Sequence, residues 1–404
     1  MTEYQTYRGP SQRRGLRIAL AVAGVAFLGC GGSGAASRRT IRMEELRVTP
    51  GGVYDAESLF AEAFDLAKAK RCPEAVDRYD RVVREFPTSE FVSAALYNAG
   101  LCLMESGDAN GGIARFERLL REHADSPDTK HGRFQLLALY LRVHRDADAI
   151  SVADALLADK ALDPDERMEA MSMRSEALLS LGSLDDAERQ ARIAVAFYRE
   201  GSERDEVHGF SQAAQANFVL ADVLRQRSEA IAIPPGTAEE QHQVLERRAQ
   251  LLLKAQTEYF NTIRYTDPAW AARAGYQIGA LYDRMWATIS EAPVPPPRRK
   301  FGEADMRIYE DEYRKEMARM IRPLVRHAIR YWELTLMMIE RASVDSEWSA
   351  KLKADLEAAR TRLRLTAPDD GDDAAGEDAR QEPHVPSRGS DALAKPPAPA
   401  ATTP

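Results

Sequence analysis

Histidine and serine are the side chains that most often carry out acid–base and nucleophilic chemistry, but their spacing in this chain favours neither. The seven histidines form no HExxH or comparable ligand pattern; they are His123, His131, His144, His208, His242, His327 and His384. Ser211 lies in the sequence GFSQA, which imitates part of a nucleophile elbow, but no predicted strand precedes it. We therefore predict a protein that is not an enzyme, has no catalytic residues, binds no metal and needs no cofactor.

Glycine-rich and acidic runs could hold phosphate or calcium, but here they lack the required partners. Residues 107–112 read GDANGG, without the Lys and Ser/Thr of a phosphate loop. Residues 369–373 read DDGDD, without the spaced ligands and closing Glu of a calcium loop. The formal net charge is −8 and no basic face is clustered, so nucleic acid is a poor partner for this chain.

Cys30 is the side chain with the most informative surroundings. Four arginines, Arg8, Arg13, Arg14 and Arg17, precede the apolar run 18–28, and small residues follow it. This order is typical of a secretory signal, and the run is shorter than the roughly 20 apolar residues of a membrane span. The residues Phe27-Leu28-Gly29-Cys30 resemble the lipobox of bacterial lipoproteins, with Phe27 where the family usually has Leu.

The lipoprotein resemblance implies a location and an anchor. Residues 1–29 would be removed, a diacylglycerol would be attached to the Cys30 thiol, and residues 30–55 would form a flexible tether. Gly31 is not the Asp that commonly retains such proteins in the inner membrane, so we expect the periplasmic face of the outer membrane. The alternative is an uncleaved anchor or a chance apolar segment. An oxidising periplasm would allow Cys72 and Cys102 to pair, and their spacing alone leaves open whether they meet. Cysteines at such places are more often small apolar fillers.

Small residues recur along the chain with a period near 37. One row is separated by 37, 37 and 38 residues and consists of Ala75, Gly112, Ala149 and Ala187. A second row precedes the first by twelve residues and consists of Ala63, Gly100, Leu137 and Ser175, of which Leu137 is larger than the pattern expects. Apolar residues at helical spacing surround both rows, which predicts pairs of helices in close contact.

The two rows resemble the tetratricopeptide repeat, in which small residues at the eighth and twentieth positions let two antiparallel helices approach closely. The usual period is about 34 residues, so longer helices or connectors are expected. The resemblance implies an all-α solenoid of about six helix pairs, with repeats one to four in residues 56–200. It places an apolar, partner-binding row on the inner face: Phe60, Phe64, Tyr97, Leu101, Met104, Phe134, Ala138 and Leu141.

Residues 201–365 depart from the regular period. The small residues Ala221 and Gly279 mark two further first helices, but their partners Ala255 and Ala328 arrive 34 and 49 residues later rather than twelve. The proline clusters at 234–235 and 295–297 fall within these insertions. We expect long second helices over 239–263 and 303–341, the latter kinked or interrupted near Pro323.

The end of the chain consists of a predicted helix followed by a tail of different composition. An amphipathic helix over about 346–365 would cover the exposed end of the array. Residues 366–404 hold eight acids, three bases and seven prolines, a composition that predicts a disordered acidic tail.

Three functions remain open from the sequence. The first is an outer-membrane-anchored scaffold that binds segments of other envelope proteins, similar in architecture to the repeat lipoproteins of β-barrel assembly. The second is a structural part of a trans-envelope machine for secretion, gliding motility or cell-wall coordination. The third is a cell-wall glycosidase with paired carboxylates, although no pair is singled out. The oligomeric state stays open.

Overall fold

The computed structural model describes residues 47–49, 52–342 and 347–365. The predicted signal sequence, Cys30 and the acidic tail lie outside these residues. Thirteen helices are described: α3 Ala56–Lys68, α4 Cys72–Glu85, α5 Val92–Glu105, α6 Ala109–Glu122, α7 Asp128–Arg142, α8 Asp146–Ala158, α9 Pro164–Ser180, α10 Leu184–Glu203, α11 Phe210–Glu229, α12 Ala238–Arg264, α13 Pro268–Ser290, α14 Glu303–Ala342 and α15 Glu347–Leu365.

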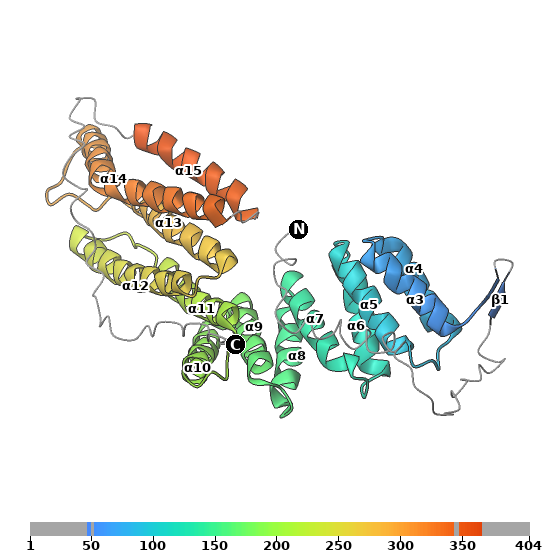
Figure 1. The fold of residues 1–404 in the computed structure, drawn as a ribbon. Coiled ribbons are helices and arrows are strands. Elements are labelled where there is room, and N and C mark those ends of the chain that lie inside the picture. The colour runs from blue at the N-terminus through green and yellow to red at the C-terminus, as the bar shows by residue number, and fades with distance from the viewer. Residues whose placement is uncertain (1–46, 50–51, 343–346, 366–404) are drawn as a thin grey trace, which may run out of the picture.

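The helices from α3 to α14 pack as six consecutive pairs, and α15 packs on the last pair (Figure 1). Each first helix also contacts the first helix of the next pair, from α3 through to α15. Second helices make at most marginal contacts with one another in the described part of the chain. First helices therefore line the inner face of the array, and the predicted α-solenoid with a capping helix is confirmed.

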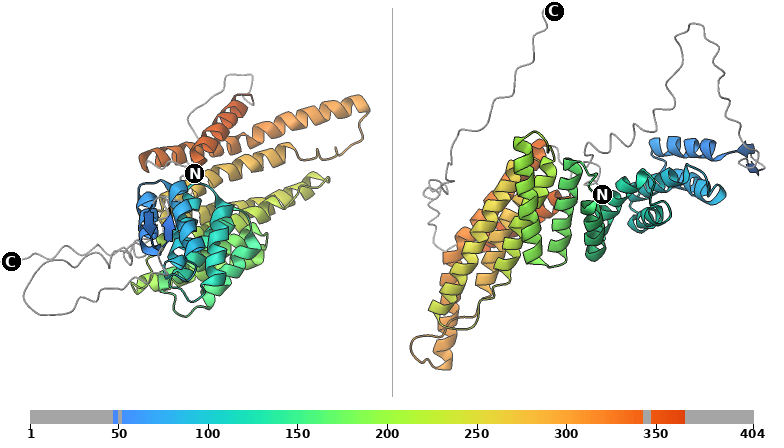
Figure 2. Two further views of the ribbon diagram at one scale, coloured as in Figure 1. Left: turned by 90° about the vertical axis from the view of Figure 1, so that its right-hand side faces the viewer. Right: turned by 90° about the horizontal axis from the view of Figure 1, so that it is seen from below.

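Two arms can be distinguished in the solenoid (Figures 1 and 2). The N-terminal arm comprises α3–α8, with helices of 13 to 15 residues. The C-terminal arm comprises α9–α15 and contains the longest helices, α12 with 27 residues and α14 with 40. Figure 2 shows α12 and α14 extending beyond the neighbouring helices.

The recurring small residues allow the close helix pairs, as the sequence predicts. Ala63, Ala75, Ala149 and Ala187 are all 0% exposed. A Cβ added to Gly100 would lie 2.7 Å from the ring of Phe116, so only glycine fits under that ring. Leu137, larger than the repeat pattern expects, is also 0% exposed and fills the space between α7 and its neighbours.

The turn inside each of the first four pairs has a residue with positive φ at an equivalent position. Gly107 and Gly182 have φ of 84° and 82°, and Lys70 and His144 have φ of 61° and 56°. A positive φ ends a right-handed helix and reverses the chain, which glycine does at no steric cost. Lys70 and His144 make the same reversal although they carry side chains.

The long second helices of the C-terminal arm occur where the sequence predicts them. Thr237 and Glu240 form a capping box that starts α12, after the proline cluster at 234–235. The prediction for Pro323 was a kink or an interruption; α14 runs unbroken from Glu303 to Ala342, so the interruption is wrong. The indole of Trp332 lies against Gly279, and its Nε1 donates to the Tyr276 carbonyl at 2.9 Å. These contacts fix α14 against α13 in the half of the helix that follows the proline.

A short hairpin precedes the first helix, which the predicted tether over 30–55 did not include. β1 Arg47–Thr49 pairs antiparallel with β2 Gly52–Tyr54, with Val48 opposite Val53. The ring of Tyr54 packs edge-on against Phe86 at 6.1 Å, and the Arg81 guanidinium lies 4.7 Å above it. Six residues are too few to show an apolar period, so contact with α4 decides the structure here.

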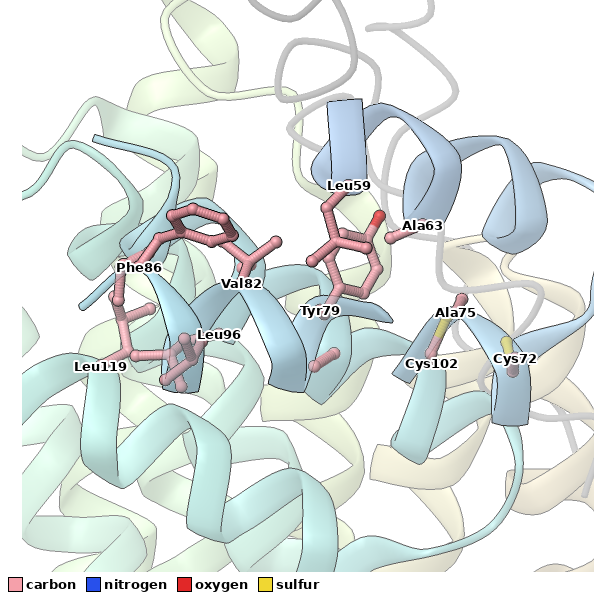
Figure 3. Packing of buried hydrophobic residues seen from close by; sticks show 14 residues of the cluster. Leu59, Ala63, Cys72, Ala75, Tyr79, Val82, Phe86, Leu96, Cys102 and Leu119 are labelled. Carbon is pink, nitrogen blue, oxygen red and sulfur yellow. The ribbon is translucent and has the colours of Figure 1, made fainter. Parts of the chain in front are cut away.

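Figure 3 shows the core of the first two pairs, where Leu59, Tyr79 and Val82 meet between α3 and α4. Cys72 and Cys102 belong to this core; both are buried and both are free thiols. Burial and the neighbouring Cys72 thiol raise the pKa of the Cys102 thiol. The structure therefore shows Cys72 and Cys102 as small residues that fill the apolar core.

Candidate partner-binding surface

The inner-face strip is the row of apolar residues on α3, α5 and α7 that the repeat pattern singled out. The structure places them on consecutive first helices, which contact one another. Seven are partly exposed: Phe60, Phe64, Tyr97, Leu101, Met104, Ala138 and Leu141. Phe134 is 7% exposed and belongs to the core between the second and third pairs. The strip therefore offers seven of the eight predicted side chains to solvent.

Aromatic contacts fix the strip at its α3 end. The Phe60 ring lies 5.5 Å from Tyr79 and 5.3 Å from Phe91, so it bridges α4 and the start of α5. The Lys68 ammonium stands 4.6 Å from the centre of the Phe64 ring, one turn further along α3. A ring held on one side and open on the other is a rigid apolar contact for a partner.

The middle of the strip belongs to α5. Tyr97 packs edge-on against Phe116 at 5.8 Å, and burial raises the pKa of Tyr97 to about 12. Leu101 and Met104 pack on one side against the core of the second and third pairs. Their other sides stay accessible, and together with Tyr97 they cover about two turns of α5.

Polar contacts at a spacing of 35 residues join successive helix pairs, on first and second helices alike. Lys70 pairs with Glu105 at 3.1 Å, and Arg115 pairs with Asp80 at 2.6 Å. The Ser93 hydroxyl donates to Asp128 at 3.0 Å. These contacts fix the register between pairs, so the strip is continuous from one first helix to the next.

Comparison with known families supports the repeat pattern. Residues 94–126 match the family model described as tetratricopeptide repeat. This segment covers α5 and α6 and contains Tyr97, Leu101 and Met104.

The chain carries a tetratricopeptide repeat. Solved structures similar to it include a tetratricopeptide repeat protein from Parabacteroides merdae, at 14% identity and a TM-score of 0.37, covering 77% of this chain and 98% of that one. Yeast Tom70 is similar at 14% identity and a TM-score of 0.39, covering 77% and 48%. MamA from Desulfovibrio magneticus RS-1 is similar at 14% identity and a TM-score of 0.34, covering 48% and 94%. Among curated proteins, no sequence matches the chain.

In the last helix pair of the array, α13 and α14, the equivalent inner-face position is covered instead of open. Counting from Gly100 and Gly279, Tyr276 on α13 is the equivalent of Tyr97 on α5. Tyr276 is only 5% exposed, because α15 covers it. Its hydroxyl donates to Asp355 at 2.7 Å, and its ring lies 5.1 Å from Trp348. The capping helix thus closes over a position that stays partly open in the second repeat.

A buried polar network joins the two helices of the fifth pair, α11 and α12. Asp222 is 7% exposed and accepts from Arg225 at 2.7 Å and from the hydroxyl of Tyr259. Burial raises the pKa of Asp222 and the Arg225 guanidinium lowers it, and the net effect is a lowered pKa. Arg225 also pairs with Glu229 at 2.7 Å. Sequence reasoning missed this network, although the Asp222–Arg225 spacing of three on a helix was visible.

The other residues weighed for chemistry stay apart in the fold. Ser211 lies in the first turn of α11 with no strand before it. Among the described residues, no three His, Cys, Asp or Glu side chains gather as a metal site. In the same part of the chain, no helix has the length and apolar character of a membrane span.

Proposed function

We propose that this protein is an interaction scaffold whose inner-face strip holds extended or helical segments of other proteins. The observation that carries the proposal is the row of partly exposed apolar side chains on α3, α5 and α7. An exposed apolar row along consecutive helices would cost free energy in water unless a partner covered it. Repeat arrays present such a row as a long groove, which suits a peptide or a helix rather than a small molecule.

We further propose that Cys30 carries a lipid and that the scaffold works from the periplasmic face of the outer membrane. The sequence of Arg14 to Cys30 supports this proposal, together with Gly31. An anchor raises the effective concentration of every bound partner near the membrane. Intact mass of the membrane-extracted protein tests the anchor. A lipidated chain that begins at Cys30 would support it, and a mass that includes Met1 would contradict it.

A pull-down after mild crosslinking in cells tests the strip. The variant Leu101→Glu/Met104→Glu places two charges in the strip and should reduce co-purified protein at least fivefold. Ile193→Glu is the matched control, because Ile193 is apolar and 49% exposed but lies on the second helix α10. Circular dichroism must show that both variants stay helical. Equal capture by all three proteins would rule out the strip.

The identity of the captured proteins decides between the two envelope roles. Components of β-barrel assembly would place the scaffold in that process. Components of a motor or a secretion complex would support a structural part of a trans-envelope machine instead.

A further inference from the structure

A second recognition surface lies far from the strip, at the end of the C-terminal arm. It is a pocket of about 400 Å³ between the loop that precedes α14, the first turns of α14 and the start of α12. The proline cluster 295–297 and the rings of Phe301, Tyr309 and Tyr313 line it. We call these residues the aromatic pocket.

The aromatic pocket has fixed walls. The Tyr309 hydroxyl donates to the Pro295 carbonyl at 3.0 Å, which ties the loop to α14. The Tyr309 ring lies 5.9 Å from Phe301 and 6.2 Å from Tyr313. Pro295 is buried, whereas Phe301, Tyr309 and Tyr313 keep part of their surface exposed. Grooves lined by aromatic rings are the surfaces that bind proline-rich segments, because such segments are already extended and lose little entropy.

The rim of the pocket is strongly basic. Arg298, Arg299 and Lys300 form the only run of three consecutive basic residues in the sequence. All three are exposed, and none of them is in an ion pair with a described residue. Arg299 instead stands 5.4 Å from the centre of the Phe301 ring. A segment that combines acids with prolines would match both the rim and the walls.

The chain contains such a segment immediately after its last helix. Seven of the eight acids in 366–404 fall between Asp369 and Glu382, and Pro383 and Pro386 follow with PxxP spacing. The acids are possible partners for the basic rim, and the prolines are possible partners for the aromatic walls.

The C-terminal end of α15, from which this segment continues, lies near the end of α13 that leads into the pocket loop. Arg362, three residues before the end of α15, pairs with Asp283 and lies 4.4 Å from the centre of the Trp286 ring. Ser290, the last residue of α13, is four residues beyond Trp286, about 6 Å along the helix axis. The loop that forms the pocket follows directly. Pro383 lies 18 positions after Leu365, enough to span up to about 60 Å.

We propose that the acidic, proline-containing tail, residues 366–404, docks in the aromatic pocket of its own chain. The acids between Asp369 and Glu382 pair with the basic rim, and the PxxP segment packs on Tyr309 and Tyr313. The connection through α15 makes the contact intramolecular, so a weak interface suffices to keep the pocket occupied. The pocket is then a self-covered site, which a competing acidic, proline-rich segment opens by displacing the tail.

Zero-length carbodiimide crosslinking of the full-length protein, followed by mass spectrometry, tests this contact. The reagent joins a lysine amine to a carboxylate that touches it, so Lys300 reports on the tail directly. We expect crosslinks from Lys300 to acids between Asp369 and Glu382 in the monomer, at a yield that does not depend on protein concentration. The variant Arg298→Glu/Arg299→Glu keeps Lys300 and should lower this yield at least tenfold. Arg326→Glu/Arg330→Glu changes two exposed arginines of α14 away from the pocket and should leave the yield unchanged.

Three results would overturn the proposal. Tail acids that crosslink equally to Lys254, Lys315 and Lys300 would show a tail with no preferred site. A yield that rises with protein concentration would assign the pocket to the tail of a second copy. Crosslinks that vanish when vesicles of anionic lipid are added, with the protein then bound to the vesicles, would assign the basic rim to a membrane surface.

Discussion

The two arms of the solenoid use the same close helix contact but stabilise it in different ways. In the N-terminal arm, short helices meet through alanine, glycine and apolar rings, and ion pairs lie at the surface. In the C-terminal arm, long helices enclose a charged network around Asp222 and Arg225, and Trp332 packs beneath Gly279. The contact between small residues is therefore common to both arms, while the buried charged network belongs to the C-terminal arm.

The arms differ equally at the inner face. The N-terminal arm leaves Tyr97, Leu101 and Met104 partly exposed, whereas α15 covers Tyr276 in the C-terminal arm. A covered inner face cannot bind a peptide without moving a helix. The comparison supports the proposal that the N-terminal arm, and not the covered last helix pair, binds partners.

Removal of one large ring from each arm should have the largest effect. Phe116 is 0% exposed and Trp332 is 1% exposed, so Phe116→Ala and Trp332→Ala should each lower the free energy of unfolding by about 3–5 kcal/mol. Because repeats contact only their neighbours, the loss should stay local. Hydrogen exchange should rise in α3–α8 for the first variant and in α11–α15 for the second. Faster exchange of both arms in either variant would show that the array unfolds as one unit.

Removal of one acidic side chain from each arm should give losses of stability that differ more between the arms. Asp222→Ala leaves the guanidinium of Arg225 buried with one partner fewer and should cost about 3–5 kcal/mol. Asp80→Ala breaks the ion pair with Arg115, whose side chains are about one third exposed, and should cost about 1 kcal/mol or less. Urea unfolding of both variants measures the difference. Similar losses would remove the distinction between a buried network and surface pairs.

The junction of the arms should be sensitive to pH through Glu169 on α9. Burial, and then the nearby charges of Glu166 and Asp163, raise the pKa of Glu169 from 4.5 to about 7. A folded protein that holds this proton more tightly than the unfolded chain loses stability as the pH rises from 4.5 to about 7. The loss should reach about 3 kcal/mol and stay constant above that range.

Urea unfolding at pH 5 and pH 7.5 checks this dependence. Glu169→Gln should remove it, and Glu203→Gln, at the exposed end of α10, should not. An unchanged pH dependence in Glu169→Gln would assign the effect to other groups.

The smallest expected effect concerns the turns of the N-terminal arm. His144 has a φ of 56° where Gly107 and Gly182 occupy the same place in other repeats. His144→Gly should therefore raise the free energy of unfolding by up to about 1 kcal/mol, and Gly107→Ala should lower it by about the same amount. Denaturant midpoints of the two variants measure both changes. A lower free energy of unfolding for His144→Gly would show that the contacts of the His144 side chain stabilise the fold by more than its positive φ destabilises it.

Most of the fold could be predicted because it rests on a short-range rule. Two small residues twelve apart mark a helix pair, and the rows through Ala75 and Gly100 repeat that mark along the chain. The last helix pair still has these small residues, Gly279 and Ala328, although an insertion lies between them.

What could not be predicted depends on contacts between distant residues. The bond from Tyr259 to Asp222 joins positions 37 apart on two helices, and no local pattern identifies that pair. The hairpin at 47–54 is too short to show a period, and its end is held by Phe86 and Arg81. The inner-face strip was predicted as a row, but the burial of Phe134 depends on how three neighbouring helices meet.

Site-specific photo-crosslinking in cells tests the central claim, the division between an open and a covered inner face, most directly. A benzoylphenylalanine at Leu101 on α5 would be compared with one at Gln277, a partly exposed residue of α13 beside the covered Tyr276. We predict adducts with partner proteins from position 101 and at least fivefold fewer from position 277. Equal yields, or a higher yield from position 277, would contradict the assignment of partner binding to the N-terminal arm.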